Sequence, residues 1–275
     1  MDRVDSHQHF WRLERGDYSF PTPVLKPIYR DYGPADLTPI LDKWKIGKTV
    51  MVQVTETVEE TRFLLELAAT SDRFAGVVGW VDFTGAEATV KIDDLAQNPK
   101  LKGFRPMIQS IPADDWILRP DITTAVQQMT RRKLSLDALT MPRHLPHLKI
   151  LLERHPELSV VIDHGSKPEI RSDQFQPWAE EMREIARESR ACCKLSGLVT
   201  EARSDWSVDT LRRYVDHIIA CFGADRVMWG SDWPVVNLAG GYDAWAEATD
   251  KLLSGLNAKE RDAILGGTAT QFYRL

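Results

Sequence analysis

The 275-residue chain has few cysteines and no long apolar segment. Its three cysteines, Cys192, Cys193 and Cys221, are too few for a disulfide framework, and we expect Cys192 and Cys193 to be buried and unreactive. No run reaches the roughly 18 apolar residues that a membrane-spanning helix needs. The first ten residues, MDRVDSHQHF, have no apolar core, so we expect no signal peptide. Together these absences predict a soluble, cytoplasmic protein.

The chain also has no excess of positive charge. Its 35 Lys and Arg against 40 Asp and Glu give a net charge of -5. Because phosphate backbones are bound mainly by basic surfaces, nucleic acid is not an expected partner. The hydrophobic share of 43% and the charged share of 27% exclude a disordered or fibrous chain. With no linker-like segment, residues 1–275 are predicted to form one domain.

Short apolar or β-branched runs alternate with amphipathic stretches along the chain. We predict eight strands, at residues 3–5, 49–54, 75–81, 101–105, 133–136, 159–163, 192–195 and 226–229. Helices are predicted at residues 59–69, 145–155, 178–189 and 208–222. Eight such units predict an α/β fold, a (β/α)8 TIM barrel. A doubly wound open sheet is the alternative, but no G-x-G-x-x-G follows the first strand.

In such a barrel the active site is built from the loops that follow the strands. His7 and His9 follow the first strand, and residues two apart on a strand point to the same face. That spacing suits two ligands of one metal ion. His164 ends the sixth strand, where it could donate to a substrate carbonyl or bind a metal. The alternative is that these histidines only pack against their neighbours or form structural hydrogen bonds.

Two charged residues complete the candidate catalytic group. Asp232, in RVMWGSDWP after the eighth strand, suits a general base for water or a metal ligand, and desolvation there should raise its pKa. A structural turn aspartate is the alternative. Arg105 ends the fourth strand and could hold a carbonyl or carboxylate group through two hydrogen bonds. A salt bridge with a loop acid is equally consistent with its position.

These positions give the chain a resemblance to the amidohydrolase superfamily. The segments DSHQHFW, LKGFRPMIQ, VIDHGSKP, CKLSGLVTEA and RVMWGSDWP are similar to its sugar-lactonase branch, which includes L-fuconolactonase-like and L-rhamnonolactonase-like hydrolases. The resemblance runs from residue 5 to residue 275. It implies a distorted (β/α)8 barrel that hydrolyses the lactone of a sugar acid.

The resemblance also bears on metal content. Superfamily members with two metals carry a carboxylated lysine after strand four and a histidine after strand five, where this chain has Arg105 and Asp137. The resemblance therefore implies at most one divalent ion, with zinc as the first candidate, bound by His7, His9 and Asp232. It is equally consistent with a site that works without metal.

The leading hypothesis is hydrolysis of an aldono-1,4- or 1,5-lactone such as L-fuconolactone. Asp232 would take a proton from water, while His164 and Arg105, or a metal ion, would stabilise the developing oxyanion. The residues expected to contact the sugar are Gln53, Trp80, Asp82 and Trp233. A metal-dependent decarboxylase of the same superfamily and a non-catalytic sugar-acid binding barrel are the alternatives. The expected partner is the small lactone, and the sequence leaves a homo-oligomer open.

Overall fold

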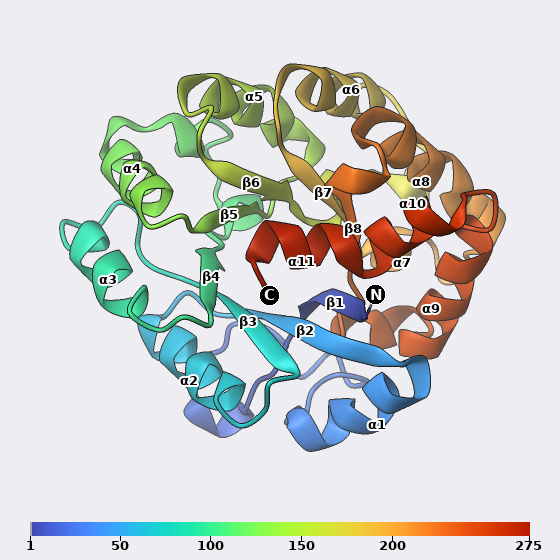
Figure 1. Ribbon diagram of the computed structural model, residues 1–275, viewed down its shortest axis with the longest axis horizontal. Helices are drawn as coiled ribbons and strands as arrows, with labels where there is room; N and C mark the ends of the chain where they lie inside the picture. The colour runs from blue at the N-terminus through green and yellow to red at the C-terminus, as the bar shows by residue number, and fades with distance from the viewer. Residues whose placement is uncertain (1) are drawn as a thin grey trace.

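The computed structural model describes residues 2–275 as a barrel of eight parallel strands, ordered β1 to β8 as along the chain (Figure 1). The predicted (β/α)8 fold is confirmed. The strands are β1 Arg3–Gln8, β2 Ile46–Val52, β3 Phe74–Gly79, β4 Leu101–Phe104, β5 Ser135–Ala138, β6 Ser159–Ile162, β7 Cys192–Leu195 and β8 Val227–Trp229.

Most of the helices form an outer ring around the strands, while α11 lies across the barrel (Figure 1). In α6, for example, Trp178, Met182 and Ile185 are buried while Glu180 and Arg187 on the other face are exposed. This is the stripe that a helix packed on a sheet requires. The helices are α1 Pro34–Trp44, α2 Val58–Ala68, α3 Ala88–Leu95, α4 Thr123–Arg131, α5 Leu145–Arg154, α6 Trp178–Glu188, α7 Leu198–Glu201, α8 Val208–Phe222, α9 Gly241–Leu252, α10 Ala258–Asp262 and α11 Thr268–Tyr273. Among residues 2–275, no helix has the length and hydropathy needed to cross a bilayer.

The predicted elements match the observed ones to within a few residues, with the widest differences at the first two strands. The second strand begins at Ile46 rather than at residue 49. The first strand differs at its end. We predicted that it ends at residue 5, but β1 continues to Gln8. The extension is paired, because Gln8 lies in register with Met51 of β2 and its side-chain amide donates to Thr49 Oγ1 at 3.1 Å. A buried strand can carry polar residues where neighbouring strands satisfy them. His7 therefore lies inside the strand.

The barrel closes between β8 and β1 through individual hydrogen bonds. The Ser6 hydroxyl donates to the Trp229 carbonyl at 2.7 Å. Beyond β8, the amide of Asp232 donates to the His7 carbonyl at 2.8 Å, and the amide of His9 donates to the Trp233 carbonyl at 2.7 Å. Closure of the barrel thus fixes the loop that carries Asp232 directly against the histidines of β1.

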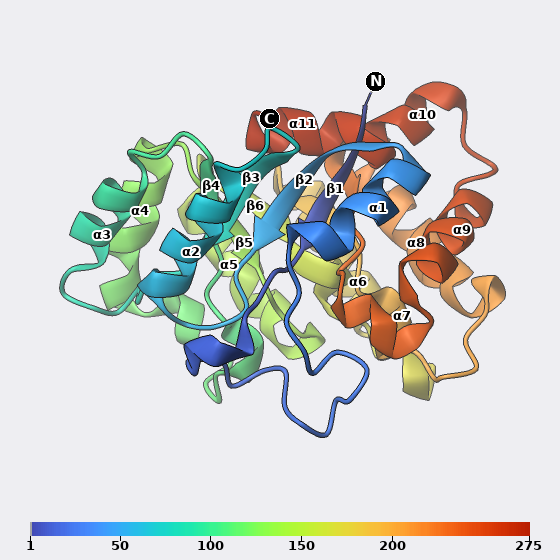
Figure 2. The same cartoon turned by 90° about the horizontal axis from the view of Figure 1, so that it is seen from below.

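The two ends of the barrel are covered differently. Helix α11 crosses the end where the strands begin, near both chain termini, and the segment between β1 and α1 lies at the opposite end (Figure 2). Ala269 and Tyr273 of α11 pack against Val50, Val161 and Met228 from the strands. The helix therefore covers this end of the barrel largely through apolar contacts.

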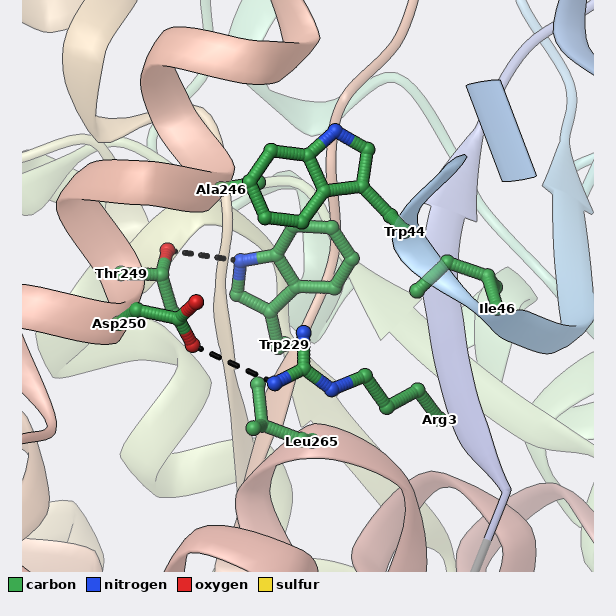
Figure 3. Close-up of a pocket in the computed structure, with 8 residues that line it drawn as sticks. All are labelled: Arg3, Trp44, Ile46, Trp229, Ala246, Thr249, Asp250 and Leu265. Atoms are coloured by element: carbon green, nitrogen blue, oxygen red, sulfur yellow. Dashed lines mark hydrogen bonds and ion pairs between the residues drawn. The ribbon is translucent and has the colours of Figure 1, made fainter. Parts of the chain in front are cut away.

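A small cavity lies between α1, α9 and the beginning of β1 (Figure 3). Trp229 lines this cavity, and its indole N–H donates to Thr249 Oγ1 at 2.9 Å. Arg3, also in the lining, pairs with Asp250 at 3.4 Å. Its volume of about 10 Å³ is near the minimum for one water molecule. It is a packing defect and is too small for a substrate.

The contact between β4 and β5 is tight enough to require glycine. Gly103 lies opposite Ser135, and a Cβ at Gly103 would overlap the hydroxyl and backbone carbonyl of Ser135. We expect Gly103→Ala to lower the free energy of unfolding by at least about 2 kcal/mol, within the range for overpacked cores. Urea denaturation measures the loss. Gly255→Ala is the control, because no atom lies within 4 Å of its added Cβ, and an equal loss in both variants would contradict the argument.

Candidate active site

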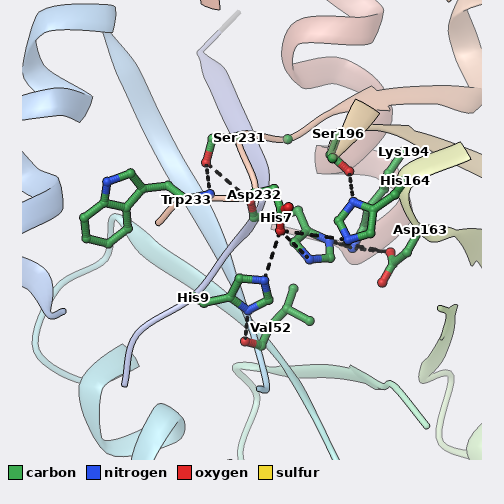
Figure 4. Close-up of polar contacts among 12 residues, drawn as sticks. His7, His9, Val52, Asp163, His164, Lys194, Ser196, Ser231, Asp232 and Trp233 are labelled. Atoms are coloured by element: carbon green, nitrogen blue, oxygen red, sulfur yellow. Dashed lines mark hydrogen bonds and ion pairs between the residues drawn. The ribbon is translucent and has the colours of Figure 1, made fainter. Parts of the chain in front are cut away.

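Three histidines surround one carboxylate at the end of the barrel where the strands finish (Figure 4). Asp232 Oδ1 lies 3.2 Å from His9 Nε2, 3.8 Å from His7 Nε2 and 3.9 Å from His164 Nε2. All four side chains are at least nine-tenths buried. Three segments of the chain, separated by more than 60 residues of sequence, therefore meet at one carboxylate oxygen.

The backbone is unusual at two of these residues. His164 has a φ of 55° and Asp232 a φ of 58°, both in the left-handed region that residues other than glycine rarely adopt. Such conformations recur at functional sites, where the surrounding structure holds them. Gly197 supports this arrangement, since a Cβ there would lie 2.5 Å from His164 Nδ1. Glycine at 197 thus leaves room for the imidazole.

A fully buried lysine lies beneath the histidines. Lys194 Nζ on β7 is 2.6 Å from Asp137 Oδ2 and 3.0 Å from Asp163 Oδ1. It is also 3.1 Å from His7 Nδ1. The Tyr273 hydroxyl donates to Asp137 Oδ2 at 2.5 Å. The ammonium is therefore paired with two carboxylates and lies beside the His7 ring, and the network links α11 to the histidine cluster.

Arg105 approaches the same imidazole from the other side. Its Nη1 is 3.3 Å from His7 Nε2 and 3.6 Å from Asp163 Oδ2, and its Nη2 donates to the Gln53 carbonyl. The Gln53 amide returns a hydrogen bond to the Arg105 carbonyl at 2.7 Å. Gln53 thus positions Arg105 from below.

The electrostatics of the site differ from one sequence expectation. Burial alone would raise the pKa of Asp232, but the surrounding imidazoles of His164, His9 and His7 hold the pKa of that carboxyl well below its usual range. The prediction of a raised pKa was wrong, because it counted desolvation and not the imidazoles. Burial lowers the pKa of His164 to about 4, so this ring is neutral at neutral pH. Asp232 is accordingly ionised.

The donor atoms of the cluster fit a divalent ion. His7, His9 and Asp232 each offer a ligand atom, and these atoms lie within 4.8 Å of one another. His9 Nδ1 is 2.7 Å from the Val52 carbonyl, which only accepts, so Nδ1 carries the proton and Nε2 presents a lone pair. That lone pair faces an oxygen of Asp232 at 3.2 Å. Two acceptors this close call for a cation or a proton between them. A backbone partner that fixes the imidazole is also typical of metal ligands.

A cavity of about 330 Å³ opens above the cluster. His9, Arg105, His164 and Asp232 line it, which brings the predicted catalytic residues together in one wall. The remaining lining residues are Ser19, Phe20, Val54, Met107, Gln109, Ser110, Leu139, Lys167, Thr200, Glu201, Val235 and Leu238. His7 lies behind this wall, fully buried.

The four residues expected to contact the sugar are not in this lining. Gln53 lies below Arg105, and Asp82 is exposed, with its carboxylate accepting from the Thr84 amide at 3.0 Å. The Trp80 amide is bonded to Thr61 Oγ1 at 2.8 Å. The Trp233 ring packs against Phe10 and Tyr32, with centroids 6.0 and 5.0 Å away. Trp233 therefore has a packing role in the structure.

The sequence reasoning did not single out the other polar residues of the lining. Gln109, Lys167 and Glu201 lie in the loops after β4, β6 and β7, where the barrel principle directs attention. Their position in loops that follow strands was the available signal. Which residue of each loop turns inward depends on backbone turns that the sequence does not show.

The whole chain matches a known family. The family model described as amidohydrolase matches residues 4–275. The chain belongs to the amidohydrolase family.

Two amidohydrolase relatives are named L-fucono-1,5-lactonase. One, from Burkholderia ambifaria, is 42% identical over 99% of this chain and 96% of its own length. Another, from Burkholderia multivorans, is 36% identical over 99% of this chain and 96% of its own length. A solved amidohydrolase structure from B. multivorans with bound zinc has 35% identity, full coverage of both chains and a TM-score of 0.93.

A buried glutamate supports the cavity from the side. Glu60 Oε2 accepts hydrogen bonds from the amides of Val54 at 2.9 Å and Thr55 at 2.7 Å. Val54 lines the cavity. Burial raises the pKa of Glu60 from 4.5 to about 7. The loop after β2 is therefore held by a carboxyl group that titrates near neutral pH.

Glu60 should make stability depend on pH. Because its pKa is higher in the folded state, the folded protein binds more protons between pH 4.5 and 7, and stability falls as pH rises through that window. Glu60→Gln keeps an oxygen acceptor and does not titrate. We expect the stability of this variant relative to wild type to rise by on the order of 3 kcal/mol from pH 4.5 to 7.5. Urea unfolding across this range measures the difference. Exposed Glu157→Gln should follow wild type, and a parallel course for Glu60→Gln would count against the assignment.

Proposed function

We propose that this protein is a lactonase that opens a sugar-acid lactone, an aldono-1,5- or 1,4-lactone such as L-fuconolactone, to the free aldonate. The observation that carries the proposal is the ionised Asp232 carboxylate among three imidazoles at the wall of a substrate-sized cavity. Similarity over the whole chain to two proteins named L-fucono-1,5-lactonase supports the substrate class.

Asp232 serves as the general base in this proposal. Its carboxylate takes a proton from a water molecule, whose oxygen forms a bond to the lactone carbonyl carbon. When the ring C–O bond breaks, protonated Asp232 returns the proton to the leaving alkoxide. A carboxylate of lowered pKa is a weak base, and it suffices because a lactone is a reactive ester.

Arg105 and His164 stabilise the oxyanion. Both line the cavity beside Asp232. The Ser196 hydroxyl lies 2.9 Å from His164 Nδ1, and its donation there leaves the proton on Nε2, which faces Asp232. A neutral imidazole N–H and a guanidinium are suitable donors to a developing negative charge.

His7, His9 and Asp232 would hold a single divalent ion, with zinc the leading candidate. Such an ion supplies Lewis acidity and lowers the pKa of bound water. The fitting donor set and the zinc-bound relative support this assignment.

Removing the base should abolish most turnover. Asp232→Asn is expected to lower kcat for L-fucono-1,5-lactone at least about a hundredfold, the typical contribution of general base catalysis. Proton release in a pH-indicator assay gives the rate. Exposed Asp72→Asn is the control. Activity of Asp232→Asn within about threefold of wild type would remove Asp232 from this role, and CO2 release without lactone opening would favour a decarboxylase.

Metal binding should be single and should depend on His9. Calorimetric titration with zinc is expected to give one equivalent per chain. His9→Gln should weaken zinc binding at least about tenfold, because loss of a residue that only orients a metal ligand already costs that much affinity. His217→Gln, on α8, should leave binding unchanged. We expect chelation to lower activity only in part. Two equivalents per chain would refute the single site, and complete, zinc-reversible loss of activity would show that the ion is obligatory.

A further inference from the structure

The cavity lining has a second polar group besides the proposed catalytic residues. Lys167 Nζ lies 3.0 Å from Gln109 Oε1 and 3.1 Å from Glu201 Oε1. All three side chains line the cavity. The Lys167 and Glu201 side chains retain 24% and 26% exposure, so neither is sealed from a ligand. Lys167 and Glu201 therefore present a paired cation and anion to whatever enters.

The position of Lys167 relative to His164 is fixed by a short turn. The amide of Lys167 donates to the His164 carbonyl at 2.9 Å, and Lys167 itself has a left-handed φ of 51°. Glu201 belongs to α7, which follows Gly197, the residue that accommodates the His164 ring. His164 and Lys167 thus lie in the same loop after β6, so a ligand bound by Lys167 is held at a fixed position relative to His164.

The chemistry of the pair matches a sugar hydroxyl. Within residues 2–275, Lys167 uses two of its three ammonium hydrogens on Gln109 and Glu201, which leaves one to donate. The Glu201 carboxylate retains acceptor positions. A hydroxyl group accepts one hydrogen bond and donates another, so adjacent hydroxyls can satisfy both partners at once. The lining also has apolar residues, among them Met107, Leu139 and Leu238.

We propose that Lys167 and Glu201, with Gln109 orienting the ammonium, form the group that recognises the hydroxyls of the lactone. They make this site selective for polyhydroxylated lactones over unsubstituted ones. The proposal rests on the proposed lactonase function and names the feature of the substrate that the site selects. A site built to pair with a hydroxyl discriminates against an analogue lacking it, because the polar groups are then left unpaired.

The test compares L-fucono-1,5-lactone with δ-valerolactone, a six-membered lactone without ring hydroxyls. Lys167→Met should raise KM for L-fucono-1,5-lactone at least about tenfold, the loss expected for a hydrogen bond to a charged group, with kcat within about threefold. For δ-valerolactone, kcat/KM should stay within about twofold of wild type. Glu201→Gln conserves the shape of the side chain and should also lower kcat/KM for L-fucono-1,5-lactone relative to kcat/KM for δ-valerolactone. It provides a second measurement if Lys167→Met folds poorly.

Lys149→Met is the matched control, because Lys149 also bridges two acids, Glu184 and Glu188, at 2.7 and 2.9 Å on the outer helices. It should leave both substrates unaffected. Equal loss on both lactones, or unchanged KM for the sugar lactone in both cavity variants, would overturn the recognition role while leaving the lactonase assignment intact. Failure of the wild type to open either lactone would instead overturn the proposed function, and the recognition role with it.

Discussion

The fold depends on the pairing of one buried positive charge, the ammonium group of Lys194, with carboxylates from neighbouring strands. Lys194 is fully buried on β7, and an unpaired charge there would cost several kcal/mol. Asp137 on β5 and Asp163 just after β6 pair with it at 2.6 and 3.0 Å. The Lys194 ammonium holds the pKa of Asp163 well below its usual range against the effect of burial. Neighbouring strands must therefore align for these charges to pair, and their alignment places Lys194 against His7.

That pairing connects the two ends of the barrel. Tyr273, on the helix that plugs the end where the strands begin, donates to Asp137, and burial raises the pKa of this tyrosine. From Asp137 the polar contacts pass through Lys194 to His7, and from there to Asp232 at the opposite end. In barrel enzymes one end is commonly associated with stability and the other with chemistry. Here a continuous line of buried polar groups joins them.

The fold could be predicted well from the sequence, and the candidate site could be predicted in part. Strands such as β6 were found because buried parallel strands read as apolar runs, and His164 and Asp232 because chemistry in a barrel follows its strands. Trp233 and Lys167 show where this reasoning ends. Trp233 follows a strand too, but its ring packs against Phe10, and Lys167 turns inward through a left-handed turn. Such rotations depend on tertiary contacts that no local pattern records.

The arrangement of charge suits a neutral substrate that becomes an anion. Within the proposed reaction, a lactone enters without charge and meets an ionised Asp232 and the Lys167–Glu201 pair in the cavity lining. Ring opening creates a carboxylate at the carbon nearest Asp232. Two like charges a few ångströms apart in a cavity partly shielded from bulk water repel more strongly than they would in water. The carboxylate that initiates the reaction therefore also disfavours its product, so the ring-opened aldonate is expelled from the position that the neutral lactone occupied.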